Sequence, residues 1–200
     1  MNEAAMPFYP PNTLIVCEGT RTEPLYFRAM ADRINALYCS EVEQPRVTVV
    51  GAGKNTRSLL HFARRLAARR PETELIWLVY DRDDFPGDDF DNTQYAAAAI
   101  AGPPHYRVAW SNECIELWFL LHFQDLHADI GRANYRALLR RYFPYEKNLP
   151  DLYQRLAPYT AAAIRRARAL LADCGHLPPS RCCPATRVHE LVEFLTAYLT

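Results

Sequence analysis

The stretch that decides the fold is residues 74–81, which read ELIWLVYD. Six apolar residues run without interruption into Asp81, and such a run is typical of a strand buried on both faces of a parallel sheet. Three other segments have the same character, with β-branched or apolar residues that end in glycine or a polar group. They are TLIVCEG at 13–19, RVTVVGAG at 46–53 and YRVAWSN at 106–112.

Segments with helical periodicity separate these four strands. We expect helices at 22–37, 56–70 and 92–102, and a further helix from Glu113 to about Phe123. Strands that alternate with helices predict a parallel sheet with helices on both faces. We therefore expect an α/β fold with a parallel four-stranded sheet over residues 1–125. A helical C-terminal third at 126–200 should pack on this core within a single structural domain.

The composition is that of an ordinary globular protein, because half of the 200 residues are apolar. Basic and acidic side chains balance at 23 each, but they are unevenly distributed. Acidic residues concentrate at 81–91, whereas 132–168 holds nine basic residues and two acidic ones. This asymmetry suits a metal site beside a polyanion. Composition alone favours the simpler interpretation, which is complementary solvated surfaces.

The sequence indicates a cytoplasmic protein without a membrane span. The N-terminal residues have neither a basic region nor an apolar core, so they do not form a signal peptide. The longest apolar run, at 115–123, is too short to cross a bilayer. The six cysteines show no paired spacing and are expected to be ordinary thiols. A loose group of cysteines and histidines at 174–189 lacks the spacing of a zinc site.

Carboxylates stand at the ends of two predicted strands. Glu18 ends the first strand, and Asp81 and Asp83 end the third as a DxD pair. Ligands of open parallel sheets bind beyond the carboxyl ends of the strands. If these two strands are neighbours, the three carboxylates meet at one rim, where Mg²⁺ or Mn²⁺ would offset their repulsion. Acids at strand ends are also common turn formers, so the combination is more specific than either motif alone.

Glu116 is a second unusual carboxylate, since it lies within the apolar run at 115–123. A lone buried carboxylate is costly, and we expect Glu116 to point toward the metal rim, directly or through Asn112. An exposed stripe on a half-buried helix is the alternative. Glu113 is better explained as an acid in the first turn of a helix, where it complements the helix dipole.

Five segments together resemble the RloB-like proteins, and the resemblance covers about residues 13–195. The segments are VCEGTRTEPLYF (16–27), VYDRDDF (79–85), SNECIELWFLLHF (111–123), YEKNLPDLY (145–153) and CPATRVHELV (183–192). The resemblance implies a Toprim-like fold and a place in bacterial phage defence or abortive infection. It also implies that Glu18 is a general acid/base or metal-proximal carboxylate and that Asp81 and Asp83 are metal ligands. The chain departs from the pattern at Glu113, where relatives usually have proline, and at Cys183, where they often have asparagine.

The leading hypothesis is metal-dependent cleavage of nucleic-acid phosphodiesters. Mg²⁺ or Mn²⁺ at Glu18, Asp81 and Asp83 would neutralise the phosphate, and Glu116 would belong to the same site. Lys54 or Lys147 would stabilise the developing charge. Several basic residues of the C-terminal third would bind backbone phosphates of DNA, RNA or tRNA, with tyrosines between them as stacking candidates. These residues are Arg140, Arg141, Lys147, Arg165 and Arg166.

Two alternative functions remain open at the level of sequence. Relatives are typically encoded beside an SMC- or ABC-like ATPase, so the chain is alternatively a non-catalytic or conditionally active partner of such an ATPase. A phosphatase or nucleotidyl enzyme that uses the DxD pair with Mg²⁺ is the other alternative. The sequence is compatible with a homo-oligomer and does not fix the oligomeric state.

Overall fold

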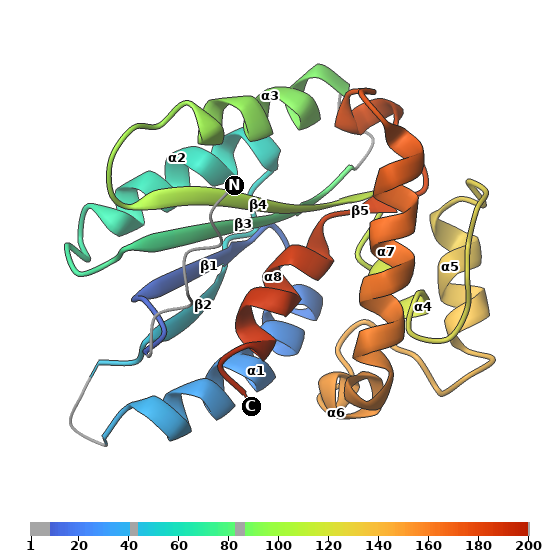
Figure 1. The fold of residues 1–200 in the computed structure, drawn as a ribbon, viewed down its shortest axis with the longest axis horizontal. Coiled ribbons are helices and arrows are strands. Elements are labelled where there is room, and N and C mark those ends of the chain that lie inside the picture. Colours follow the sequence, from blue (N-terminus) through green and yellow to red (C-terminus); the bar gives the residue numbers. More distant parts are fainter. Residues whose placement is uncertain (1–8, 41–43, 83–86, 200) are drawn as a thin grey trace.

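The computed structural model describes residues 9–40, 44–82 and 87–199. Its centre is a five-stranded sheet in the order β2-β1-β3-β4-β5 (Figure 1). The strands are β1 (Thr13–Cys17), β2 (Val47–Gly51), β3 (Leu75–Asp81), β4 (His105–Asn112) and β5 (Ala185–Thr186). Asp83, the second acid of the DxD pair, lies outside the described residues.

The first four strands are parallel, so the predicted α/β fold is confirmed. The sheet differs from the predicted four-stranded one by β5, which pairs antiparallel with the end of β4 through Ser111↔Thr186 and Asn112↔Ala185. This strand has two residues, too few to carry a periodic pattern. It also follows a proline-rich segment, which the sequence pattern marks as a break rather than a strand.

Helices cover both faces of the sheet (Figure 1). In Figure 1, α2 and α3 lie on one face and α1 and α8 on the other, while α4 to α7 gather at one end of the sheet. Within the described part of the chain, none of these helices combines the length and apolar character needed to cross a membrane. Their bounds are α1 Thr22–Tyr38, α2 Thr56–Ala67, α3 Gly87–Ala98, α4 Glu116–Leu120, α5 Arg132–Leu139, α6 Leu152–Leu156, α7 Thr160–Cys174 and α8 Val188–Thr196.

Three helical segments differ from their predictions. The helix expected at 92–102 is α3, which begins earlier and ends earlier, at Gly87–Ala98. The helix expected from Glu113 is shorter, because residues 113–115 form the turn that leads from β4 into α4. In the helical C-terminal third, the segment after residue 150 is divided into α6, a 3₁₀ turn at Ala157–Tyr159, and α7. Pro158 lies in that turn and has no N–H to donate to a continuous helix.

The alternating side chains of the strands divide the core into two clusters. Leu14, Val16 and Leu78 point toward α2 and α3. Ile15 and Trp77 belong to a larger cluster on the other face. That larger cluster also takes in residues of the C-terminal third, among them Tyr135, Leu156, Ala163, Val188 and Leu191. The C-terminal helices are therefore built around the same core cluster as α1.

Gly51, at the end of β2, allows the chain after β1 to pass close by. A Cβ at this position would lie 2.8 Å from the carbonyl oxygen of Gly19 and 2.9 Å from Cα of Thr20. Both are backbone atoms, so a side chain would displace the loop that follows Cys17. Gly51 thus fixes the path of this loop, which carries Glu18 and leads into α1.

Trp118 should be a major contributor to the stability of the larger cluster. It is fully buried, and its indole Nε1 donates to the hydroxyl of Tyr26 at 3.1 Å. We expect Trp118→Ala to lower the free energy of unfolding by about 3–5 kcal/mol, because the change leaves a cavity and an unpaired Tyr26 hydroxyl. Urea denaturation followed by circular dichroism measures this loss. Leu37→Ala is the control, since Leu37 is 63% exposed, and equal losses in both variants would contradict the assignment.

Candidate functional site

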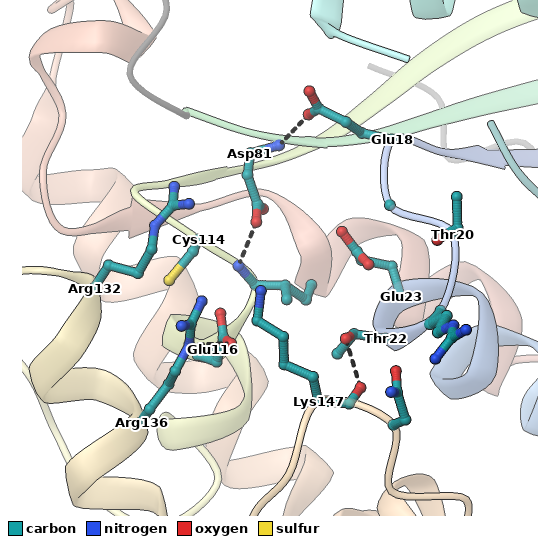
Figure 2. Close-up of a pocket in the computed structure, with 14 residues that line it drawn as sticks. Glu18, Thr20, Thr22, Glu23, Asp81, Cys114, Glu116, Arg132, Arg136 and Lys147 are labelled. Atoms are coloured by element: carbon teal, nitrogen blue, oxygen red, sulfur yellow. Dashed lines mark hydrogen bonds and ion pairs between the residues drawn. The ribbon is translucent and has the colours of Figure 1, made fainter. Parts of the chain in front are cut away.

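The carboxyl ends of β1 and β3 open into a cavity of about 410 Å³ (Figure 2). Its walls come from the loop after β1, the first turn of α1, the end of β3, the turn into α4, one face of α5, and the segment before α6. Acidic and basic side chains both contribute. The residues that line it are Glu18, Gly19, Thr20, Arg21, Thr22, Glu23, Asp81, Cys114, Ile115, Glu116, Arg132, Arg136, Lys147 and Asn148.

Glu18 and Asp81 meet at this rim because β1 and β3 are adjacent and parallel. The backbone N–H of Asp81 donates to Glu18 Oε2 at 3.1 Å. Asp81 Oδ2 in turn accepts from the backbone N–H of Ile115 at 3.1 Å. Glu18 and Asp81 therefore lie close together, as expected from the neighbouring strands. One carboxylate oxygen of this pair, Asp81 Oδ1, is buried and has no hydrogen-bond partner among the described residues.

The environment of Asp81 disfavours its negative charge. Burial raises the pKa of Asp81 well above its usual value, and the nearby carboxylates of Glu23, Glu116 and Glu18 raise it further. The Ile115 N–H opposes this shift without cancelling it. A bound cation or a bound proton would relieve such a site.

The residues around Asp81 fit a hard divalent cation in their chemistry. Asp81 Oδ1 is an unpaired buried acceptor, and its acidic neighbours are oxygen donors of the kind that Mg²⁺ prefers. Within the described ranges, no three acidic, cysteine or histidine side chains are already grouped as a metal site. The cysteines and histidines of 174–189 are not grouped in this way either. All six cysteines of the chain are free thiols.

Glu23 is a site residue that the sequence analysis missed. It lies in the first turn of α1, is buried, and lines the cavity. Gly19 makes room for it, because a Cβ there would lie 2.7 Å from Glu23 Oε1. Acids are common in first turns, where they complement the helix dipole, so Glu23 carried no distinct signal. The only sequence feature that could have pointed to the site is that Glu23 follows Glu18-Gly19 closely along the chain.

Glu116 lines the cavity, but its carboxylate already forms an ion pair and a hydrogen bond within the protein. It is 2% exposed, and its Oε1 accepts from Arg136 Nε at 2.9 Å and from the hydroxyl of Tyr145 at 3.2 Å. Burial alone would raise its pKa, but hydrogen bonds from the Cys114 thiol and Arg136 outweigh burial, so the pKa is lowered. Glu116 is thus a charged carboxylate that holds Arg136 at the cavity. Its predicted catalytic role stays a prediction.

A cationic wall faces the carboxylates. Arg132 and Arg136 come from α5, and Lys147 comes from the segment before α6. Figure 2 shows the Lys147 side chain pointing into the cavity between Glu116 and Glu23. The hydroxyl of Thr22 donates to the Lys147 carbonyl oxygen at 2.5 Å and so ties this segment to α1. Arg21 is the N-cap residue of α1, and Thr22 is the first residue of the helix.

Lys54, predicted to stabilise charge during catalysis, and the other predicted phosphate-binding residues lie apart from the cavity. Lys54 does not line it. Arg140 and Arg141 line a separate depression beside Tyr142. Arg165 donates to the carbonyl of its own helix at Ala161. Arg166 is committed to structure, since it donates to Asp125 at 3.2 Å and to the Leu121 carbonyl at 2.9 Å.

Asn112 at the end of β4 and Glu113 after it form hydrogen bonds with neighbouring segments outside the cavity. The peptide bond between Asn112 and Glu113 is cis, and Glu113 precedes α4 rather than beginning it. Glu113 Oε2 accepts from the backbone N–H of Arg132 at 2.8 Å, at the start of α5. The Asn112 side chain donates to the Pro179 carbonyl at 3.1 Å, so the expected link from Glu116 through Asn112 is not formed.

The Glu116–Arg136 pair should respond to substitution as a buried ion pair. We expect Arg136→Met to lower the free energy of unfolding by about 3 kcal/mol, because it leaves Glu116 buried without its partner. Adding Glu116→Gln should recover most of the loss. Urea denaturation of the double-mutant cycle measures both effects. Arg155→Met is the matched control and should change little, since Arg155 and Asp151 form an exposed pair.

The same pair predicts a pH dependence. The folded-state pKa of Glu116 is below its ordinary 4.5, so its stabilising contribution is complete above the unfolded pKa and is lost as pH falls through the folded value. The difference in unfolding free energy between wild type and Glu116→Gln should therefore shrink on acidification. A difference that grows as pH falls would contradict the ion-pair assignment.

Comparison with known proteins gives a match to one family model. No solved structure and no protein with a curated description matches the chain significantly. The family model described as RloB-like protein matches residues 13–195, which include every described residue that lines the cavity. The chain therefore belongs to the RloB-like protein family.

Proposed function

We propose that the protein is a Mg²⁺- or Mn²⁺-dependent nuclease of the Toprim-like type that cleaves nucleic-acid phosphodiesters. One observation carries the proposal. A buried carboxylate oxygen without a partner, Asp81 Oδ1, lies among further carboxylates and opposite a wall of arginine and lysine. Carboxylates that bind a cation beside cations that bind a phosphate are the parts that phosphoryl-transfer sites require.

The carboxylates at the strand ends would hold the metal. Asp81 supplies the unpaired oxygen, and Glu18 and Glu23 are the nearest additional donors on the β1–α1 side of the cavity. Asp83 is the further ligand that the family resemblance implies, and it lies outside the described residues. A bound divalent ion would neutralise the phosphate and make a bound water more acidic.

The opposite wall would bind and orient the phosphate. Lys147 extends into the cavity, and Arg132 and Arg136 border it (Figure 2). Arg136 is held by Glu116, so its guanidinium is oriented before a substrate arrives. Glu18, whose Oε2 is fixed by the Asp81 N–H, is the group proposed to accept or donate a proton.

The separate depression at Arg140 and Arg141 supports a nucleic acid as substrate. These arginines lie beside Tyr142, which is 45% exposed and stacks on Phe123 with ring centroids 4.5 Å apart. Exposed aromatic rings beside arginines suit single-stranded nucleic acid. The role in phage defence and the partnership with an SMC- or ABC-like ATPase rest on the family resemblance and belong to the same proposal.

The alternative enzyme class makes a different prediction about products. A phosphatase or nucleotidyl enzyme would release phosphate from free nucleotides or turn them over, and would leave oligonucleotides intact. A partner module of an ATPase would cleave neither substrate by itself. Product analysis with DNA, RNA, tRNA and free nucleotides separates these functions.

Asp81 should be required for metal binding. We expect Asp81→Asn to abolish saturable Mn²⁺ binding, because the amide lacks the charge that the cation requires. Isothermal titration calorimetry with and without a short oligonucleotide measures the binding. Asp32→Asn removes one exposed carboxylate of α1 and is the control. Equal heats for wild type and Asp81→Asn in both titrations would reject the metal site.

Lys147 should contribute to cleavage without contributing to metal binding. Its ammonium group lies where charge on a bound phosphate would develop, so Lys147→Gln should lower kcat roughly 100-fold. The affinity for Mn²⁺ should stay unchanged, because the substitution removes no carboxylate. Single-turnover cleavage and calorimetry test the two parts separately. A loss of metal affinity in Lys147→Gln would place this residue in a structural role.

A further inference from the structure

A second concave surface lies over the exposed side of α2 and the loop that precedes it. This depression, which we call the α2 groove, has a volume of about 720 Å³. None of its described lining residues is acidic, and four of the six carry a basic or titratable nitrogen group. They are Lys54, Ser58, His61, Arg64, Arg65 and Ala68.

Helix periodicity explains why these residues share a surface. The opposite side of α2, which includes Leu59, Leu60 and Ala63, is buried against the sheet and α3. His61, Arg64 and Arg65 therefore lie on the outer side and are exposed. Cationic side chains gathered in one depression repel one another, and an anion that occupies it would offset that repulsion.

Local acids do not neutralise this surface within the described chain. No ion pair among the described residues involves Lys54, Arg64 or Arg65. Arg57, earlier on the same helix, differs from these residues because it forms an ion pair. Its guanidinium lies 3.5 Å from the Asp89 carboxylate. Within the described chain, the positive charge of the α2 groove is thus not offset by ion pairs of Lys54, Arg64 or Arg65.

The α2 groove adjoins the candidate site at its Lys54 end. Gly53 precedes Lys54 and lies beside Thr20, since a Cβ on Gly53 would be 3.1 Å from Thr20 Cγ2. Thr20 in turn lines the cavity that holds Glu18 and Asp81. The helix is about 18 Å long at 1.5 Å per residue. That length corresponds to about five phosphates of one duplex strand at 3.4 Å each.

We propose that the α2 groove binds the phosphate backbone of a nucleic-acid strand that extends from the candidate site. The inference rests on the proposed function for the nature of the substrate. It assigns Lys54 to backbone binding rather than to the catalytic role expected from the sequence. It also adds Arg64 and Arg65, which the sequence analysis did not single out. Contacts of this kind set affinity and register and carry no base specificity.

Nucleic acid fits this surface better than an anionic membrane does. Surface helices that bind membranes stably usually place large apolar side chains in the lipid beside the basic ones. The described residues that line the α2 groove include none, and the exposed large apolar residues of the described chain lie elsewhere. A chain of phosphates matches the elongated basic surface.

The test compares two double variants that remove the same charge. Arg64→Gln/Arg65→Gln changes the α2 groove. Arg33→Gln/Arg168→Gln changes exposed arginines of α1 and α7, and it leaves α2 intact. Fluorescence anisotropy measures binding of a labelled duplex and a labelled single strand at several salt concentrations. EDTA is present throughout, so neither metal binding nor cleavage contributes to the signal.

We expect the α2 groove variant to bind roughly 10- to 30-fold more weakly near 0.15 M salt, independently of base sequence. The slope of log K against log salt should become shallower by about 0.9 for each phosphate contact that is lost. Lys54→Gln should give a smaller change in the same direction. The control variant should match wild type.

Three results would overturn the proposal. They are no binding by the wild type, an unchanged affinity in the α2 groove variant, and equal losses in both double variants. Binding of the wild type to phosphatidylserine vesicles but to neither oligonucleotide would favour a membrane instead. Failure of the nuclease proposal would look different, since the wild type would bind both oligonucleotides in this assay and the α2 groove variant would bind them more weakly, but the wild type would cleave neither when Mg²⁺ or Mn²⁺ is added.

Discussion

The hydrogen bond from the Asp81 N–H to Glu18 Oε2 is the contact on which the candidate site depends. It joins residues 63 positions apart, and it forms because β1 and β3 are parallel neighbours whose carboxyl ends share one edge of the sheet. The loop after β1 then follows a path that Gly51 permits, and this path brings Glu23 behind Gly19. Three acidic residues therefore converge through backbone geometry and not through any attraction between them.

Two acidic residues of the cavity have opposite environments. Glu116 is paired with Arg136 and Tyr145, and its pKa is lowered. Asp81 has only backbone support for one oxygen and none for the other, and burial raises its pKa. The first arrangement is complete within the protein. The second is completed by a cation or a proton, and this difference separates a residue that positions a neighbour from one suited to bind a metal.

Sequence patterns predicted the elements well where a periodic run was long. The buried run at 74–81 predicted β3, and the four parallel strands followed from strands alternating with helices. Short or interrupted elements were missed, because β5 has two residues and Pro158 divides a helical pattern. Acidic strand ends predicted Glu18 and Asp81 as site residues. Glu23 was missed because a first-turn acid looks the same whether it faces a cavity or solvent.

The sequence by itself determined the family, the α/β fold and the acidic rim, because strand periodicity and the order of residues at strand ends are properties of the chain alone. Only the tertiary structure decided which cations face that rim. Lys147 reaches the cavity because Thr22 ties its segment to α1, whereas Lys54 lies in the loop before α2 and lines the α2 groove. Neither placement can be read from the local sequence, since both depend on contacts between segments that are distant along the chain.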